Sequence, residues 1–334
     1  MKRRGVTVLV GAVLVVLLSL GLFAQVPYVV LGPGPTVDTL GSANGTEVIQ
    51  VTGREVSKSE GQLRLTTVGV QPEANLYTMI VAWLDGDEAA LPRELIYPPG
   101  QTREEVDQQN QQDFATSQTS AETAALRELG FPVQVAVKKV TAGGAAEGKL
   151  REGDVITALD GTKPVDGAHL VEMIRAKPSG TTFTVSYTRG GQPGTVQVAT
   201  EGDPPRVGVE IEESQPHPFE LTIKLDEIGG PSAGLMFALG IVDKLTPEDL
   251  TGGTVIAGTG EITTRGEVKP IGGIGQKLVG AKEADATVFL TPADNCAEAV
   301  ANAQPGLMLV KVATLDEALA ALSELRAGRE PTRC

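Results

Sequence analysis

Two short segments carry a serine and a lysine whose surroundings suit hydrolytic chemistry. Ser232 stands among small residues in the sequence GPSAG (residues 230–234), and Lys277 ends the sequence PIGGIGQK (residues 270–277). A serine hydroxyl is a weak nucleophile until a base removes its proton, and an uncharged lysine amine can be that base. The pair predicts a Ser–Lys hydrolase with Ser232 and Lys277 as its catalytic residues.

The residues after Ser232 have the apolar spacing of a buried helix over 232–244. Free backbone N–H groups and the helix dipole gather where a helix begins, and they suit an oxyanion. We therefore assign the backbone of Gly230, Pro231 and Ala233 to the turn and the oxyanion site. The competing interpretation is that Ser232 is only a helix N-cap.

Lys277 belongs to a predicted helix over residues 276–286, opened by glycines. It shares a face with Ala281 and Ala284, while charged residues line the other side. A lysine on an apolar face loses water, which lowers its pKa toward neutrality. The alternative is a lysine whose stem is buried and whose ammonium reaches solvent.

Between the serine and the lysine lies TGEITTRG (residues 259–266), predicted as part of a strand, a tight turn and a returning strand. With GPSAG before it and PIGGxxxK after it, this segment resembles the proteolytic domain of Lon proteases over residues 219–315. The resemblance implies that Ser232 is the nucleophile, that Lys277 is the general base and that Thr259 hydrogen-bonds the lysine. It also implies assembly into rings, so a homo-oligomer is expected.

One departure from the Lon pattern concerns the turn before the serine. Many Lon domains carry an acidic residue there, whereas this chain has Gly229 and Gly230. Asp226 and Glu227 are the nearest acidic residues. The departure puts rate and specificity in doubt rather than the type of reaction.

Residues 131–200 form a β-rich module. The sequence GDVI at 153–156, the turn at Asp160-Gly161 and a short helix over 165–176 resemble a bacterial PDZ domain. PDZ domains bind an extended peptide as an added strand. The resemblance implies protein or peptide partners, and Gly130 and Phe131 are candidates for the loop that holds a peptide carboxylate.

A glycine-rich segment at residues 143–149 imitates a phosphate-binding loop. Leu150 stands where Ser or Thr would hold magnesium, and the segment precedes a predicted strand rather than a helix. We therefore expect no ATPase and no cofactor.

The amino-terminal region has the pattern of a membrane anchor. Three basic residues at positions 2–4 precede an uncharged, mostly apolar run over 5–24, and no charge occurs before Asp38. Twenty helical residues span about 30 Å, the thickness of a bilayer core. A cleaved signal peptide is the alternative, but the residues before Ala24 form a poor cleavage site. We expect a single-pass protein with a cytoplasmic N-terminus, a catalytic domain outside the cell membrane and the lipid bilayer as a partner through residues 5–24.

Composition excludes several function classes. The net charge of −14 disfavours nucleic-acid binding, because an acidic surface repels phosphates. The chain has two histidines and two cysteines, which makes a zinc site implausible, so no metal is expected. Cys296 and Cys334 are not expected to form a disulfide.

The expected fold class is mixed α/β, with strands near residues 47–51, 62–68 and 76–83 and a polar segment at 98–120. The Lon-type domain needs more strands than its matching segment holds, so the strands before residue 129 should complete it, with the PDZ domain inserted. The expected domains are a membrane anchor or signal sequence (1–26), an extracytoplasmic β-containing segment that packs with the Lon-type domain (27–128), a PDZ domain (129–204), a Lon-type proteolytic domain (205–325) and a tail (326–334).

The predicted function is an ATP-independent serine endopeptidase that cleaves unfolded or flexible extracytoplasmic proteins presented by the PDZ domain. The first alternative is a catalytically inactive, membrane-tethered PDZ scaffold. The second is a Ser–His enzyme that uses His217 as its base, although the neighbouring prolines favour an exposed loop there.

Overall fold

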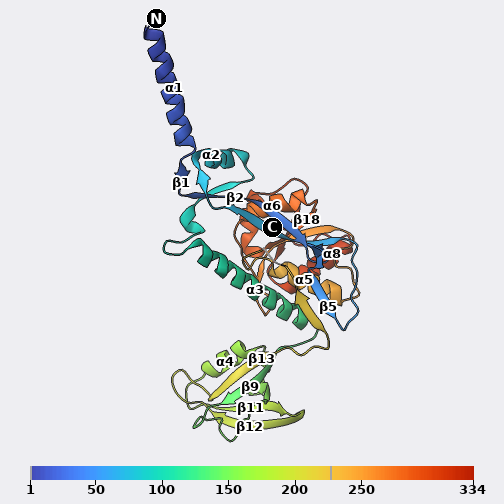
Figure 1. Cartoon of the computed structure of the whole chain (residues 1–334). Helices are drawn as coiled ribbons and strands as arrows, with labels where there is room; N and C mark the ends of the chain where they lie inside the picture. The colour runs from blue at the N-terminus through green and yellow to red at the C-terminus, as the bar shows by residue number, and fades with distance from the viewer. Residues whose placement is uncertain (1, 226–227) are drawn as a thin grey trace. The chain divides into compact units, whose positions relative to one another are not determined.

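The chain folds into two compact units, the first of which is made of two separate stretches of sequence. In the computed structural model, the described residues are 2–225 and 228–334, with side chains described from residue 9 onward. Unit 1 comprises Met1–Ala125 and Glu220–Cys334, and unit 2 comprises Leu126–Phe219 (Figure 1). The predicted mixed α/β class with a β-rich module is confirmed.

A six-stranded sheet forms the centre of unit 1. Its order is β19-β18-β15-β6-β2-β8; β6, β15, β18 and β19 are parallel, and β2 is antiparallel to both β6 and β8. Three strands precede unit 2 in the sequence and three follow it, so unit 2 is an insertion into unit 1. The strands are β2 (Tyr28–Asp38), β6 (Gln62–Gln71), β8 (Ala89–Pro92), β15 (Val255–Gly258), β18 (Val288–Pro292) and β19 (Met308–Val312).

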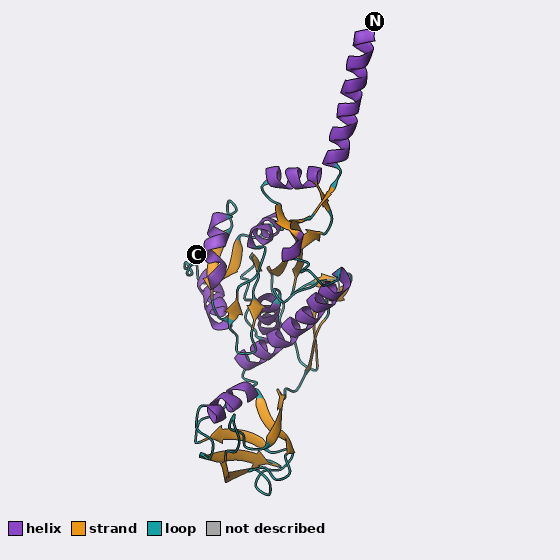
Figure 2. Ribbon diagram, turned by 90° about the vertical axis from the view of Figure 1, so that its left-hand side faces the viewer, coloured by secondary structure: helices purple, strands orange, loops and turns teal. Residues whose placement is uncertain are grey.

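Two helices cover opposite faces of this sheet at β15. Ala257 lies in a core cluster with Ile274 and Leu278 of α6 (Ile274–Glu283), whereas a Cβ at Gly258 would lie 2.6 Å from Met236 Sδ of α5 (Gly234–Leu245). Successive residues of a strand point to opposite faces, so α5 and α6 flank β15. Every residue of α5 is buried, and its first nine residues, 234–242, are all apolar. The other helices of unit 1 are α1 (Lys2–Leu22), α2 (Leu76–Asp85), η1 (Arg93–Leu95), η2 (Ala293–Asn295), α7 (Cys296–Ala301) and α8 (Leu315–Arg326), and α3 (Arg103–Glu128) begins in this unit (Figure 2).

Within the described residues, four two-stranded ladders complete unit 1. One joins the two halves of the sequence, because β14 (Glu220–Ile223) pairs with β5 (Ile49–Thr52). Another, β16 (Glu261–Ile262) with β17 (Val268–Lys269), is the predicted turn region after β15. The remaining ladders pair β1 (Gln25–Val26) with β7 (Ala74–Asn75) and β3 (Ser42–Ala43) with β4 (Thr46–Glu47).

The strand expected at residues 76–83 is wrong, because α2 occupies this segment. Asn75 and Thr78 form a reciprocal capping box, and Gly86 ends the helix in a left-handed conformation with φ of 82°. These two signals fix both ends of a helix, and they outweigh the strand preference of the Val, Ile and Tyr residues between them.

Cys296 and Cys334 form a disulfide, so the expectation of unbonded cysteines is wrong. The carboxyl-terminal tail follows β19, with Lys311 N donating to Thr332 O and Cys334 N donating to Leu309 O. This backbone pairing brings Cys334 next to Cys296 at the start of α7. The two cysteines are 38 residues apart in the sequence, so their proximity could not be predicted from it.

Replacing Cys334 with serine should lower the free energy of unfolding by about 2–4 kcal/mol, because the bond restrains the unfolded chain. Chemical denaturation of the variant and of the wild-type protein, each with and without reductant, measures the effect. Reductant should destabilise only the wild-type protein, and two titratable thiols in the untreated wild type would contradict the disulfide.

The apolar run at the amino terminus forms α1. Among the residues that the structure describes, no helix is long and apolar enough to cross a membrane. The expected transmembrane helix therefore has no support from the structure.

Unit 2 contains one five-stranded antiparallel sheet in the order β12-β11-β10-β9-β13, together with α4 (Gly167–Arg175). It has its own core, which includes Val135, Leu159 and Phe183. The unit extends beyond residue 204, the boundary expected from sequence, because β13 pairs with β9. The strands are β9 (Gln134–Val140), β10 (Val155–Leu159), β11 (Thr182–Arg189), β12 (Gln192–Ala199) and β13 (Val209–Ser214).

Candidate active site

The structure brings Ser232, Lys277 and Thr259 together at the carboxyl end of β15. Ser232 precedes α5 on one face of the sheet, Lys277 projects from α6 on the other, and Thr259 directly follows the strand. Lys277 Nζ lies 2.7 Å from Ser232 Oγ and 2.9 Å from Thr259 Oγ1. The two helices therefore deliver a hydroxyl and an amine to one point over the strand end, where ligands commonly bind in α/β folds.

Lys277 is placed to act as a base. Its residue surface is only 3% exposed, and burial lowers the pKa of its amine from 10.5 to about 7. Desolvation disfavours the ammonium form, so a large fraction of the amine is neutral near pH 7. The ammonium of Lys277 does not reach solvent, which removes that alternative.

The Ser232 loop is held by hydrogen bonds on the strand side. Thr259 Oγ1 and Gly260 N both donate to Ser232 O, at 3.0 and 2.9 Å. The N-cap of α5 is Ala233, and no side chain caps this helix. Ser232 is therefore not the helix cap, and its hydroxyl faces the amine of Lys277.

Two of the three backbone positions assigned to the oxyanion site do not fit that role. Pro231 has no N–H, and Gly230 N donates to Asn110 O at 2.8 Å. Gly230 instead shapes the turn, with φ of 85°. Ala233, at the start of α5, stays a prediction as an oxyanion donor.

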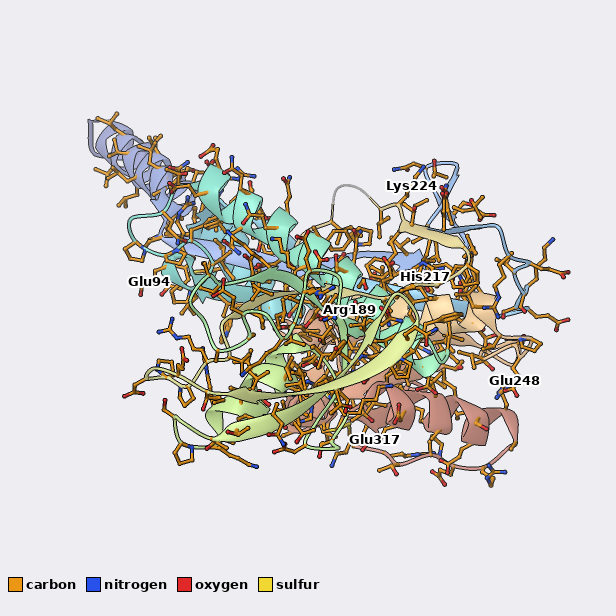
Figure 3. All side chains as sticks on the ribbon, turned by 90° about the horizontal axis from the view of Figure 1, so that it is seen from below. Glu94, Arg189, His217, Lys224, Glu248 and Glu317 are labelled. Atoms are coloured by element: carbon orange, nitrogen blue, oxygen red, sulfur yellow. A yellow bond between two sulfur atoms is a disulfide. The ribbon has the colours of Figure 1, made fainter. Side chains whose placement is uncertain are left out.

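The candidate dyad lies in a cleft of about 1550 Å³. Its wall includes apolar side chains such as Phe114 and Leu225 and amides such as Gln111. The exposed Lys224, which is labelled in Figure 3, also lines it. A cleft of this size, lined by both apolar and amide groups, suits an extended peptide. Asp226 and Glu227, the nearest acidic residues in the sequence, lie outside the described residues.

Helix α3 braces the catalytic loop, a contact that the sequence did not predict. Ser117 is buried, and its Oγ donates to Pro231 O at 2.8 Å, next to Ser232. Phe114 packs edge-on against Phe237 of α5, with ring centroids 5.8 Å apart. Asn110, Phe114 and Ser117 follow the spacing i, i+4, i+7, so they lie on one helix face. That face is the signal that could have revealed the brace.

The same helix explains the glycines that replace the expected acidic residue. A Cβ at Gly229 would lie 3.0 Å from Asn110 Cβ, which leaves little room for a side chain. Gly230 has a positive φ that side chains disfavour. The turn is therefore adapted to α3 rather than to an acidic side chain.

Replacing Ser117 with alanine should lower kcat for peptide cleavage roughly tenfold, because a small displacement of Ser232 disturbs its attack geometry. In this variant Pro231 O loses the hydrogen bond from Ser117, which should lower the free energy of unfolding by about 1 kcal/mol. Steady-state kinetics and denaturation measure both effects. Thr119→Ala, a change on the exposed side of α3, is the matched control. An unchanged kcat in the Ser117 variant would show that α3 does not position the loop.

Gly130 and Phe131 do not form the expected carboxylate-binding loop. Both backbone N–H groups close the end of α3, with Gly130 N donating to Arg127 O and Phe131 N donating to Leu126 O. The strand that follows, β9, has β10 on one side and β13 on the other. No peptide can add to β9, so the prediction for these two residues is wrong.

His217 belongs to unit 2 and has other contacts. Its Nδ1 donates to Gln215 O at 2.7 Å, and its ring packs 4.7 Å from that of Phe219. The base candidate that contacts Ser232 is Lys277, so the geometry gives the Ser–His alternative no support. Within the described residues, no group of three or more His, Cys, Asp or Glu side chains could hold a metal ion.

Comparison with known proteins assigns the region around the dyad. Residues 227–324 match the family model described as the Lon protease (S16) C-terminal proteolytic domain. The chain carries a Lon-type serine peptidase domain. α3 lies outside this matched segment of the Lon-type domain, so its brace is an addition from the sequence before unit 2. Residues 105–200 match the PDZ domain family, a segment that ends before β13.

Individual relatives are similar to parts of this chain. Lon protease 1 of Sorangium cellulosum is 45% identical over 103 residues, 30% of this chain and 12% of that protein. Lon protease 1 of Bacillus subtilis is 38% identical over 93 residues, 27% of this chain and 12% of that protein. The PDZ domain of an SdrC-like protein from Listeria monocytogenes is 23% identical, covering 23% of this chain and 85% of that structure, with a TM-score of 0.22. The chain thus covers only 12% of the length of those two Lon proteases.

Proposed function

We propose that this protein is an ATP-independent serine endopeptidase that cleaves flexible polypeptides with Ser232 and Lys277. The observation that carries the proposal is the 2.7 Å separation between Ser232 Oγ and the buried Lys277 amine. An amine with a pKa of about 7 is well matched to removing and returning a proton near neutral pH.

In the proposed reaction, Ser232 Oγ attacks the carbonyl carbon of the scissile peptide bond while Lys277 Nζ accepts the hydroxyl proton. The C–N bond then breaks, the proton passes from Lys277 to the leaving amine, and an acyl ester remains on Ser232. Water attacks this ester with Lys277 again as base, which releases the carboxylic acid and restores the serine hydroxyl. Thr259 hydrogen-bonds Nζ and keeps the amine directed at Ser232.

Unit 2 supports a role in presenting substrate. β13 is the last strand of the sheet, and α4 packs against it: Gly167 N donates to Glu213 Oε1 at 2.6 Å, and a Cβ at Gly167 would lie 2.9 Å from Ile211 Cδ1. Peptides bind PDZ domains as an added strand between a sheet edge and a helix. We assign the peptide groove to β13 and α4, which have to separate before a peptide strand can lie between them.

We place the catalytic domain outside the cell membrane, with the lipid bilayer contacting residues 5–24. The basic residues at positions 2–4 and the apolar run after them support this orientation. The disulfide between Cys296 and Cys334 adds support, because such bonds persist in oxidising compartments.

Digestion of a disordered test protein by the full chain, without ATP, tests the proposal. The wild-type protein should produce fragments, and Ser232→Ala should not. A serine-reactive phosphonate should label Ser232, as located by mass spectrometry, and the exposed-surface variant Ser323→Ala should leave cleavage and labelling intact. Absence of both turnover and labelling in the wild-type protein would instead support the inactive scaffold.

A further inference from the structure

Helix α2 exposes apolar side chains that a water-facing helix normally hides. Tyr77, Trp83 and Leu84 are 51%, 79% and 71% exposed, and Ala82 is the one buried residue of the helix. Ile80 and Val81 are also exposed. Surface helices of soluble proteins place polar residues outward, whereas α2 is apolar on its outer face as well. We call the five residues Tyr77, Ile80, Val81, Trp83 and Leu84 the α2 face.

This helix is firmly attached to unit 1, so its exposure does not come from a loose end. The capping box of Asn75 and Thr78 fixes its start, and β7 just before it pairs with β1. Ala82 packs with Val30 of β2 in a small buried cluster. The sheet therefore presents the α2 face in one orientation.

The α2 face is continuous with a second apolar surface. Phe23, 66% exposed, follows α1, and its ring centroid lies 6.2 Å from that of Tyr77. Leu76 N also donates to Ala24 O. Both ribbon views show α2 lying across the end of α1 (Figures 1 and 2). The large apolar side chains of α1 from Val13 to Leu18 are all at least half exposed, so they face every side of that helix.

We propose that the α2 face docks in the boundary between headgroups and acyl chains of a lipid bilayer. A protein partner typically covers one stripe of a helix, whereas the apolar surface of α1 points in all directions and needs a surrounding medium. Trp and Tyr favour the membrane interface because their rings are apolar and their N–H or O–H groups reach water. The inference rests on the proposed bilayer contact of residues 5–24, and it adds a second element that lies on the membrane.

Charge decides which lipids suit this surface. Residues 74–92 contain no lysine or arginine, and Asp85, Asp87 and Glu88 follow the α2 face. Docking is therefore apolar, and anionic headgroups repel the acidic end of the helix. Zwitterionic phosphatidylcholine vesicles should bind the face better than vesicles rich in phosphatidylglycerol at low salt.

Trp83 provides the test, because it is the single tryptophan of the chain. The full-length protein is reconstituted in phosphatidylcholine vesicles whose acyl chains carry bromine either near the headgroup or near the bilayer centre. Interfacial helices lie about 5–10 Å deep, so shallow bromine should quench Trp83 emission more than deep bromine. Aqueous iodide should quench it less in vesicles than in detergent-free buffer.

A reporter at Val300 is the matched control. Val300 is 53% exposed on α7, which contacts β18 and β19, whereas α2 contacts β2 and β8 at the opposite end of the sheet. In a Trp83→Phe background, Val300→Trp should be quenched by iodide and not by brominated lipid. Equal lipid quenching at both positions would indicate nonspecific adsorption and overturn the proposal.

Two further outcomes overturn it. Full access of iodide to Trp83 in protein that floats with the vesicles would leave the contact of residues 5–24 intact and refute docking of α2. A second copy of the chain would be the partner of the α2 face if protection of Trp83 from iodide increased with protein concentration while brominated lipid did not quench its emission. Peptide cleavage measured in the same samples reports the proposed function separately, because the α2 face lies outside the cleft residues.

Discussion

Replacing Lys277 with methionine is expected to lower kcat/KM for peptide cleavage by about a thousandfold or more, the scale of a lost general base. Methionine has a similar shape but cannot accept the proton of Ser232. The rate at which a phosphonate labels Ser232 should fall as well, because that reaction also needs a base to accept the hydroxyl proton of Ser232. Lys282→Met, which removes an exposed cation from the same helix, should leave both rates unchanged.

The wild-type pH profile gives an independent check. The neutral amine is the active form, and its pKa is about 7, so activity should rise as the pH passes through 7. Below about pH 6, kcat/KM should fall about tenfold per pH unit. A profile centred near 10, the range of an exposed lysine, would contradict the buried base.

The same substitution should stabilise the fold at neutral pH by about 3 kcal/mol. The pKa of Lys277 falls from 10.5 to about 7 on folding, and this shift corresponds to a cost of about 5 kcal/mol at and below pH 7. The loss of hydrogen bonds to Ser232 and Thr259 offsets part of the gain in the methionine variant, at about 1 kcal/mol each.

The sign of the pH dependence follows from linkage. Between pH 7 and 10.5 the unfolded lysine binds a proton and the folded one does not, so stability from this group rises with pH across that window. Below pH 7 both forms are protonated and the cost stays constant. The difference in unfolding free energy between Lys277→Met and wild type should therefore shrink from pH 7 to pH 10. A difference that does not change with pH would show that Lys277 is not neutral in the folded protein.

The chemistry of the site could be predicted because its residues stand in distinctive local sequences. The glycines around Ser232 and the small residues beside Lys277 on its helix indicated a nucleophile and a dehydrated amine. Their actual separation could not be read from the chain, because it depends on two helices that pack on opposite faces of β15.

Contacts between segments that are distant in the sequence could not be predicted. The brace of α3 joins Ser117 to Pro231, and the disulfide joins Cys296 to Cys334, and neither has a local pattern that identifies its partner. The loop that holds a peptide carboxylate is predicted at residues 130–131 because a Gly-Phe pair precedes a strand. Only the sheet order shows that this strand is interior and that β13 lies at the edge.

The insertion of unit 2 has a consequence for how the protein is made. β6 is synthesised before unit 2, but its parallel neighbour β15 comes after it. At about 5–20 residues per second, the ribosome needs on the order of ten to forty seconds to supply the missing neighbour. During that interval the nascent chain therefore lacks a complete peptidase domain. β6 has no strand on the side where β15 later pairs, whereas unit 2 can already fold.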